Sequence, residues 1–397
     1  MPDPSPLALS QNIRLPKEGR SVLPEFELAP DLVHLNHGSY GALPRCVLAE
    51  QQRWQTRIER DPTGFFQDEY PDAVRRSAAV AASCFGGDGH DWVFCENATF
   101  AVNSVLASLA LEPGDEILAT SHGYGAVLKA MAVWAKRRQA MLRIASLPAC
   151  VESQDQVVDL VVQCFTERTR LLVIDHITSP TAAVLPVKRI AAEAKRAGIA
   201  VLVDGAHGPG QIPLNVRDIG ADWYTGNAHK WFFAPRGCGL LWTTAERQNQ
   251  TFPAVLSHGT DRGYVAAFDW VGTRDVTPWL CLGGAAATHE SFGGASLMAR
   301  NRNFAVSAAD IVGRALNAEA SAPAGMRASM VSLRVGKGTV PEAASSLRKA
   351  LHESRIVVPV SYLEGNLYVR LSAQIYNEMS DYERCAEALG RALSDLV

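Results

Sequence analysis

A lysine and an aspartate follow two apolar runs in the middle of the sequence. Residues 200–203 (Ala-Val-Leu-Val) end in Asp204, and Lys230 follows His229 within the aromatic segment 223–231. Apolar neighbours remove water from a lysine, which lowers its pKa and makes the neutral amine available to a carbonyl. An aspartate at a strand end can keep a pyridine nitrogen protonated. Together the two residues indicate pyridoxal phosphate (PLP).

Each residue alone has an ordinary explanation. An aspartate after a buried strand can cap a loop, and lysines beside histidines are common on surfaces. However, a carboxylate buried without a partner is costly, and a pyridinium N–H would be that partner. Trp231, Phe232 and Phe233 also make a purely solubilising lysine a poor explanation. The pair therefore favours a cofactor site over either structural role.

A phosphate site is indicated by residues 96–99 (Glu-Asn-Ala-Thr), which lie between an apolar run and a helical pattern. Backbone N–H groups at a helix N-terminus and the Thr99 hydroxyl would meet an anion there. The alternative is a plain N-cap by Asn97 or Thr99. The glycines of 205–210 are in the wrong order for a dinucleotide fingerprint, and no G-x-x-x-x-G-K-[ST] motif occurs.

Three further side chains could complete such a site. His122 and Tyr124 follow another apolar run and could cover one face of a flat cofactor ring, although a hydrogen-bonded core histidine is the usual alternative. Arg370 interrupts an apolar strand pattern, and an arginine there needs an anionic partner. The carboxylate of an amino-acid substrate, bound in bidentate fashion, would serve.

Alternating strands and helices must position these residues. Short apolar runs at 92–95, 116–119, 171–174 and 200–203 are separated by helical patterns, which predicts a mostly parallel sheet covered by helices. Ligands bind beyond the carboxyl ends of such strands. We expect Asn97, His122, His176 and Asp204 to gather there.

The chain is long enough for a large domain with a smaller companion. We expect an irregular proline-rich arm over 1–31, a large domain over 32–285 and a small α+β domain over 286–397. The small domain is predicted to alternate strands and helices at 330–335, 342–352, 367–371 and 382–396.

Composition limits the function classes. The 397 residues are 47% hydrophobic and carry a net charge of -3, so no basic face for nucleic acid is indicated. The eight cysteines form no C-x-x-C pair, which argues against a zinc site or a disulfide framework. No run is long enough to span a membrane and no signal peptide is indicated, so a cytoplasmic location is expected.

Several motifs occur in an order that resembles class V aminotransferase-fold enzymes. Within that fold the sequence looks most like the isopenicillin N epimerase-like group, which includes the C-S lyases of ergothioneine synthesis. The resemblance implies PLP-dependent fold type I, with a mostly parallel seven-stranded sheet in the large domain. The motifs are residues 36–41, 97–99, 204–207, 229–231, 235–237, 272–273 and 370–372.

The resemblance also implies roles for individual residues. Lys230 would form the internal aldimine with PLP, and Asp204 would pair with the pyridine nitrogen. Thr273 would reach the phosphate in a neighbouring subunit, which implies a homodimer with shared sites. Arg370 would hold the substrate carboxylate. Further contacts are implied for His207 near the ring, Ser179 near the ring hydroxyl, His229, Ala98 and Thr99 at the phosphate, and Asn36, His37, Gly38 and Ser39 closing over the substrate.

The reaction stays open between several outcomes. Lys230 is expected to remove the α-proton of an amino acid, giving a quinonoid. Loss of a sulfur substituent then makes a lyase, whereas reprotonation from the other face by an acid such as Tyr124 makes an epimerase. Aminotransfer and a catalytically inactive PLP-fold binding protein remain alternatives. A cysteine desulfurase is disfavoured because segment 356–368 has no cysteine. Between the two branches of the resembled group, Asn227, 124–126 and 257–259 look more like the C-S lyases than like the epimerase.

Overall fold

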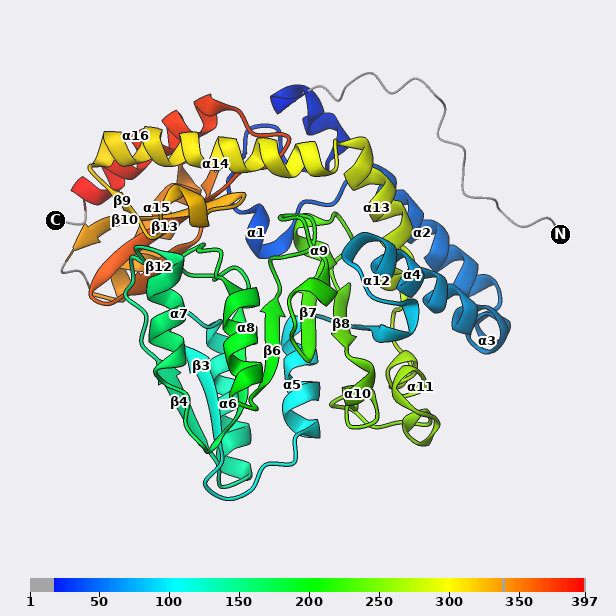
Figure 1. Cartoon of the computed structure of the whole chain (residues 1–397). Helices are drawn as coiled ribbons and strands as arrows, with labels where there is room; N and C mark the ends of the chain where they lie inside the picture. Colours follow the sequence, from blue (N-terminus) through cyan, green and yellow to red (C-terminus); the bar gives the residue numbers. More distant parts are fainter. Residues whose placement is uncertain (1–17, 338–339, 396–397) are drawn as a thin grey trace.

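The computed structural model describes residues 18–337 and 340–395. A large unit is built on a seven-stranded sheet, and a C-terminal unit built on a four-stranded sheet lies over one end of it (Figure 1). Residues 1–17 of the predicted arm lie outside the described part. The rest of the arm contains a 3-10 helix (Gly19–Glu25), and Val22 and Phe26 are buried against Phe233 and Ile375.

The large sheet has the strand order β2-β8-β7-β6-β5-β3-β4. Strands β7, β6, β5, β3 and β4 are parallel to one another, whereas β8 is antiparallel to both β2 and β7. The prediction of a mostly parallel seven-stranded sheet is therefore confirmed. The strands are β2 (Trp92–Cys95), β3 (Glu116–Thr120), β4 (Met141–Ala145), β5 (Thr169–Asp175), β6 (Ala200–Gly205), β7 (Trp223–Asn227) and β8 (Gly239–Thr243).

Helices cover both faces of this sheet, because its strands are apolar on both sides. Leu172 and Val203 contribute to one apolar layer, and the adjacent residues Val173 and Leu202 contribute to the other. The first layer includes α4 (Tyr70–Phe85), α7 (Gln154–Val162) and α8 (Val187–Arg196). The second includes α5 (Ala98–Ser108), α6 (Gly125–Arg137) and α11 (Tyr264–Asp269).

Shorter or peripheral helices complete the large unit. They are α1 (His37–Tyr40), α2 (Arg45–Arg60), α3 (Pro62–Gly64), α9 (Ala228–Trp231), α10 (Ala245–Gln248), α12 (Thr277–Leu280) and α13 (Leu282–Ser291). A π-helical stretch covers Phe65–Glu69, and further 3-10 helices cover Gly89–Asp91, Val216–Asp218, Thr260–Arg262 and Ala324–Met326. No helix in the described ranges combines the length and apolarity needed to cross a bilayer.

The C-terminal unit packs an antiparallel sheet, ordered β12-β13-β10-β9, against three helices. Its predicted strands and helices are present, with one predicted residue, Leu396, outside the described part. The elements are α14 (Ala295–Leu316), β9 (Glu319–Ala320), β10 (Met330–Lys337), α15 (Glu342–Glu353), β11 (Ile356–Val357), β12 (Val360–Leu363), β13 (Asn366–Ser372) and α16 (Met379–Ser394).

The first strand of the chain belongs to this C-terminal unit. In β1 (Val33–His34), Val33 pairs with Ile356 of β11, and the two strands are parallel. Val33 and Leu35 are buried in the C-terminal core. Helix α1 directly follows β1. The segment that extends toward the large unit is therefore anchored by the C-terminal unit. The predicted boundaries at 31/32 and 285/286 remain predictions.

Candidate active site

A cavity of about 290 Å³ lies where β5, β6 and β7 end, and we call it the Lys230 cavity. Strand ends in parallel sheets diverge and leave room for ligands, as predicted. Side chains from β13 and the α1 segment close it from the C-terminal unit. It is lined by Gly38, Ser39, Tyr40, Asn97, Ala98, Thr99, Tyr124, Asp175, Ser179, Asp204, Ala206, His207, Asn227, His229, Lys230 and Arg370.

Lys230 lies in the short helix α9, directly after β7, and its amine is surrounded by protein. Burial, together with the positive charge of Arg370, lowers the pKa of Lys230 to about 8. Its Nζ lies 3.1 Å from Nε2 of His207. Burial and nearby positive charges hold the pKa of His207 well below its usual range, so this imidazole is neutral. The amine is thus available as a base near neutral pH.

Two carboxyl groups from adjacent strands share the cavity. Asp175 ends β5 and Asp204 lies near the end of β6, and the two residues are register partners. Their exposures are 5% and 3%. Burial raises the pKa of both, and the charge of Asp204 raises that of Asp175 further. The backbone N–H of Ala206 donates to Asp204 Oδ1 at 3.0 Å, which favours ionisation of Asp204 and leaves Asp175 as the group that keeps a proton.

The N-terminus of α5 forms the opposite wall. Asn97 caps the helix, since its Oδ1 accepts from the Phe100 N–H at 2.9 Å. The Ala98 N–H donates to Oδ1 of Asn227 at 2.8 Å. Both Thr99 and Asn227 line the cavity. The alternative of an Asn97 N-cap is therefore confirmed. The hydrogen bond between Ala98 and Asn227 connects this wall to the end of β7.

A buried polar atom near that wall lacks a partner. Within the described ranges, Nδ1 of His229 is buried with no hydrogen-bond partner. Burial lowers the pKa of His229 to about 4, so the ring is neutral and one of its nitrogens can donate. An anion between His229 and the α5 N-terminus would satisfy such a donor. These residues therefore fit the phosphate of PLP.

Arg370 on β13 brings a buried positive charge to the cavity. Its Nη1 donates to the carbonyl oxygen and to Oγ of Ser179, at 2.8 and 3.0 Å. Its Nη2 donates to Oγ of Ser39 at 2.9 Å and to Oδ1 of Asn36 at 3.3 Å. All these acceptors are neutral, and no carboxylate pairs with Arg370 among the described residues. An incoming carboxylate would supply the missing negative charge.

Comparison with known proteins identifies the chain. The family model for "Aminotransferase class-V" matches residues 43–384. The chain belongs to this family. Class V enzymes depend on PLP, which agrees with the Lys230, Asp204 and His229 geometry. The prediction of family membership is confirmed, and the protein is a class V PLP-dependent enzyme.

Relatives at 25–31% identity carry out different reactions. A probable chloroplastic L-cysteine desulfhydrase from Arabidopsis thaliana is 31% identical, covering 92% of this chain and 84% of its own length. Isopenicillin N epimerase from Streptomyces clavuligerus is 31% identical (91% and 95%). Hercynylcysteine sulfoxide lyase from Schizosaccharomyces pombe is 25% identical (94% and 95%). These names support the predicted group and leave the reaction of this class V enzyme open.

Solved structures confirm the fold. An Escherichia coli cysteine desulfurase superposes with a TM-score of 0.77 at 22% identity, covering 95% of this chain and 98% of the other. The match includes both sheets, as expected for fold type I. At this identity the likeness concerns the fold alone.

Four predicted site residues do not line the cavity of this class V enzyme. Asn36 touches it only through Arg370. His37 is buried, and its Nδ1 lies 2.9 Å from the Tyr376 hydroxyl. His122 is 1% exposed, and its Nδ1 lies 2.9 Å from the Thr181 hydroxyl. Its Nε2 is buried without a hydrogen-bond partner among the described residues, so the core alternative accounts for one ring nitrogen only, and the ring-covering role of His122 and Tyr124 stays a prediction.

The fourth residue, Thr273, is exposed at the surface. Its neighbour Arg274 forms an ion pair with Glu96 at 2.5 Å, and its guanidinium lies over the Trp279 ring. The loop carrying Thr273 is therefore anchored next to the α5 N-terminus while Thr273 itself faces outward.

Four residues that line the cavity carried no assigned role in the sequence-based predictions, namely Tyr40, Asp175, Ala206 and Asn227. Asp175 ends an apolar strand much as Asp204 does, so the same pattern could have found it. Asn227 was noted only for its likeness to the C-S lyases, and its side chain accepts a hydrogen bond from the Ala98 N–H.

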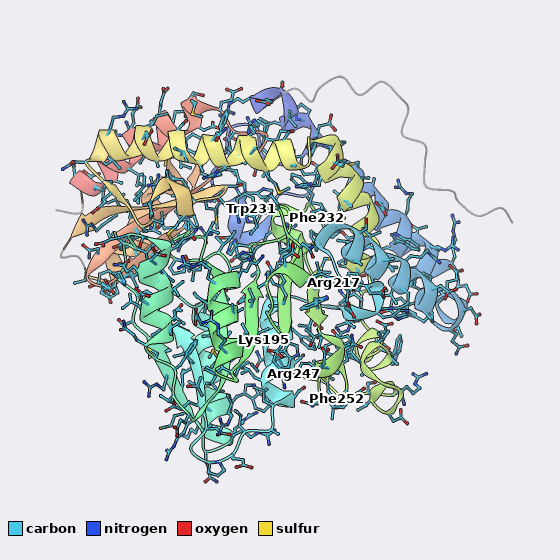
Figure 2. The ribbon with its side chains drawn as sticks, in the orientation of Figure 1. Lys195, Arg217, Trp231, Phe232, Arg247 and Phe252 are labelled. Carbon is cyan, nitrogen blue, oxygen red and sulfur yellow. The ribbon has the colours of Figure 1, made fainter. Side chains whose placement is uncertain are left out.

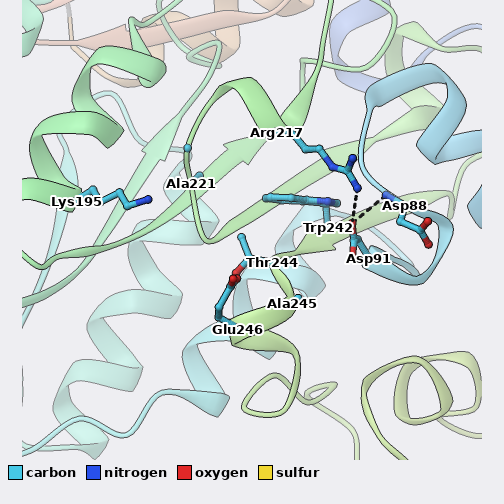
Figure 3. Close-up of a pocket in the computed structure, with 10 residues that line it drawn as sticks. Asp88, Asp91, Lys195, Arg217, Ala221, Trp242, Thr244, Ala245 and Glu246 are labelled. Atoms are coloured by element: carbon cyan, nitrogen blue, oxygen red, sulfur yellow. Dashed lines mark hydrogen bonds and ion pairs between the residues drawn. The ribbon is translucent and has the colours of Figure 1, made fainter.

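A second cavity, of about 400 Å³, lies at the opposite end of the large sheet, and we call it the Trp242 cavity. Lys195, Arg217 and Glu246 at its edge are exposed. Arg217 is paired with Asp91 at 3.7 Å (Figure 3). Figure 2 shows Trp231, next to Lys230, at the end of the sheet that faces the C-terminal unit, and Lys195 farther toward the other end.

Proposed function

We propose that this class V enzyme cleaves the C–S bond of an amino acid that carries sulfur on its side chain. Lys230 would bind the PLP aldehyde, Asp204 the pyridine nitrogen, and His229, Thr99 and Asn227 the phosphate. Bound there, PLP supplies an electron sink for the carbon that loses its proton. Support comes from the two sulfur-releasing relatives and from the residues that line the Lys230 cavity.

The chain's own groups divide the work by position. Arg370 holds the substrate carboxylate, which fixes the α-carbon near Lys230. The Lys230 amine, with its pKa near 8, removes the α-proton. Tyr124 lines the cavity and is 46% exposed, so its phenol can protonate a sulfur leaving group and pass the proton on from solvent. Each step needs one group in one protonation state.

The observation that carries the proposal is the set of proton-transfer groups in the cavity. Lys230 contributes an amine to the lining of the cavity. Tyr124 and Tyr40 contribute phenols. Phenols are weak acids that stay protonated at neutral pH, so they can donate a proton to a departing sulfur group. No cysteine lines the cavity among the described residues, so a desulfurase that carries sulfur on a thiolate is disfavoured.

Epimerisation is the second candidate. Isopenicillin N epimerase is as similar as the desulfhydrase, at 31% identity, and Tyr124 could protonate the α-carbon on the face away from Lys230. This outcome requires Tyr124 to reach the carbon itself. Elimination requires it to reach only the substituent.

We also propose a homodimer in which Thr273 contacts the phosphate in the partner's cavity. The outward position of Thr273, on a loop anchored by the Arg274–Glu96 ion pair, supports this. Light scattering on the purified protein measures the mass directly. A monomer at micromolar concentration would contradict the shared site.

One experiment separates the reactions. The PLP-loaded enzyme is given a panel of L-amino acids in deuterated water, and keto acid, ammonia, sulfur products and chirality are measured together. A lyase releases sulfur and keto acid with ammonia, an epimerase gives deuterated D-amino acid, and an aminotransferase gives keto acid with an aminated cofactor. Inversion without sulfur release across the sulfur amino acids would refute the lyase proposal.

A further inference from the structure

A tryptophan lies behind the histidine that contacts Lys230. Nε1 of Trp231 donates to Nδ1 of His207 at 3.3 Å, and Nε2 of the same ring lies 3.1 Å from Lys230 Nζ. Trp231 and His207 are 1% and 3% exposed, so water does not compete for these contacts. The three side chains form a line from the indole to the amine.

The indole fixes which nitrogen of His207 carries the proton. An indole N–H can only donate, so Nδ1 must present its lone pair. A neutral imidazole then carries its proton on Nε2, which faces Lys230. Nε2–H can donate to Lys230 only if the amine has a free lone pair. An ammonium at Lys230 would instead place two donors against each other.

The packing leaves His207 little freedom to leave this line. A Cβ at Gly38 would lie 3.2 Å from the Trp231 ring and 3.5 Å from Cε1 of His207, so helix α1 presses its bare backbone against both rings. Gln211 Nε2 donates to the carbonyl oxygen of His207 at 2.8 Å and anchors the loop. The imidazole is therefore held with Nε2 toward the amine.

The charged groups around Lys230 act in both directions. Arg370 on β13 disfavours the ammonium, whereas Asp204 on β6 favours it, and Asp175 on β5 adds to this effect only when it is ionised. His229 and His207 are both neutral, because burial and the neighbouring positive charges lower their pKa values. The protonation state of Lys230 thus depends on a near balance of charges, to which a fixed neutral donor can make a decisive contribution.

We propose that Trp231 is a positioning residue that fixes the Nε2–H tautomer of His207 and thereby favours the neutral amine of Lys230 over the ammonium. The inference deepens the proposed function, since it concerns how the reactive amine of that site is prepared. Trp231 does not line the cavity, and its indole N–H donates to His207 rather than to Lys230 Nζ, so a hydrogen-bond effect on the amine passes through His207.

The tautomer is measured on the protein before PLP is added. Two-bond ¹H–¹⁵N spectra of protein labelled in the histidine rings distinguish Nδ1–H from Nε2–H, and the His207→Gln variant assigns the signal. We expect Nε2–H in the wild type, and loss of that single form in Trp231→Phe. An Nδ1–H tautomer of His207 in the wild type would overturn the proposal, whatever the behaviour of Trp231→Phe.

The amine is measured through the pH dependence of PLP capture, followed by the absorbance of the PLP–lysine adduct. The wild-type rate should reach half its plateau near pH 8. In Trp231→Phe the midpoint should rise by at least about one unit, which makes capture roughly tenfold slower at pH 7. An unchanged midpoint would refute the role of Trp231.

Two controls separate the tautomer from packing. Trp223→Phe removes another buried indole N–H, which donates to Thr251 Oγ1 at 2.9 Å, and should leave the midpoint unchanged. Glutamine has no tautomers, so Trp231→Phe should have little effect in a His207→Gln background. An equal shift in both backgrounds contradicts the proposal. If wild-type protein captures no PLP at any pH, the proposed function fails, whereas the tautomer spectra still decide this inference.

Discussion

The two cavities at opposite ends of the large sheet differ in what surrounds their charges. The Trp242 cavity is the larger, at about 400 Å³ against 290 Å³. Its lysine, arginine and glutamate are exposed, so water screens them and their interactions are weak. The Lys230 cavity instead holds a lysine, an arginine and two aspartates that are surrounded by protein, namely Lys230, Arg370, Asp175 and Asp204. The volume of a cavity therefore does not mark the functional site, whereas the exclusion of water from its charged groups does.

Replacing the lysine of each cavity gives the largest expected difference. Lys230→Ala should lower turnover by on the order of 10³-fold, because the α-proton loses its base, and should abolish borohydride-reducible PLP binding. Lys195→Ala should leave both within about twofold, since an exposed lysine does not act on the site. Steady-state rates and reduction assays measure this contrast. Retained turnover in Lys230→Ala would show that Lys230 is not the base that removes the α-proton.

Replacing an arginine in each cavity tests the substrate contact. Arg370→Gln should raise KM roughly 10- to 100-fold with a smaller change in kcat, because a charge-assisted hydrogen bond contributes about 1.5–3 kcal/mol. Arg217→Gln should leave KM unchanged, since Arg217 pairs with Asp91 at the surface. Equal KM values for Arg370→Gln and wild type would show that another group binds the carboxylate.

Asparagines near the two cavities offer a smaller contrast. Asn227→Ala removes the acceptor for the Ala98 N–H and should weaken PLP binding about fivefold to tenfold, as expected for one hydrogen bond. Asn215→Ala removes a comparable hydrogen bond, in which Asn215 Oδ1 accepts from the Arg217 N–H. This change should not alter PLP affinity. Equilibrium titration by fluorescence checks both. Equal losses of PLP affinity in the two variants would mean that a general loss of stability, and not the altered α5 N-terminus, weakens binding.

The smallest effect concerns stability and pH in the PLP-free protein. Burial raises the pKa of Asp175, so its folded state keeps a proton that the unfolded chain loses, and stability falls as pH rises above the ordinary aspartate pKa. Asp175→Asn should therefore raise the free energy of unfolding at pH 8 by about 1 kcal/mol, with less gain at pH 5. Glu246→Gln, at the exposed edge of the Trp242 cavity, should change neither value. Urea titrations at the two pH values measure this, and a destabilised Asp175→Asn at pH 8 would contradict the assignment.

The sequence predicts the parts of the molecule whose signals are local. Strands β2, β3, β5 and β6 are nearly continuous apolar runs because helices cover both of their faces. Strand β4 lies at the sheet edge, where Met141 and Ile144 are 46% and 42% exposed, so its pattern is weaker. The two-residue strand β1 is too short to carry a pattern.

The active site shows the same difference between residues with a strong local signal and residues whose position depends on distant contacts. Lys230, Asp204 and Thr99 are adjacent to strong strand signals and line the cavity as predicted. His122 has the same local pattern, yet it does not line the cavity, and its Nδ1 lies 2.9 Å from the Thr181 hydroxyl. Side-chain direction at a strand end depends on partners far along the chain, which a local pattern does not contain. The contacts of Arg370 with neutral partners from two separate segments, Ser179 and the Asn36–Ser39 stretch, could not be read for the same reason.

The pairing of Val33 with Ile356 has a consequence for how the protein is made. On the ribosome the first strand emerges long before its partner, so the segment carrying Gly38 and Ser39 cannot take its final place until the C-terminal unit is synthesised. The wall of the Lys230 cavity that contains Arg370 arrives at the same late stage. A nascent or truncated chain can thus build the large sheet without a closed site, and reactivity is withheld until synthesis is nearly complete.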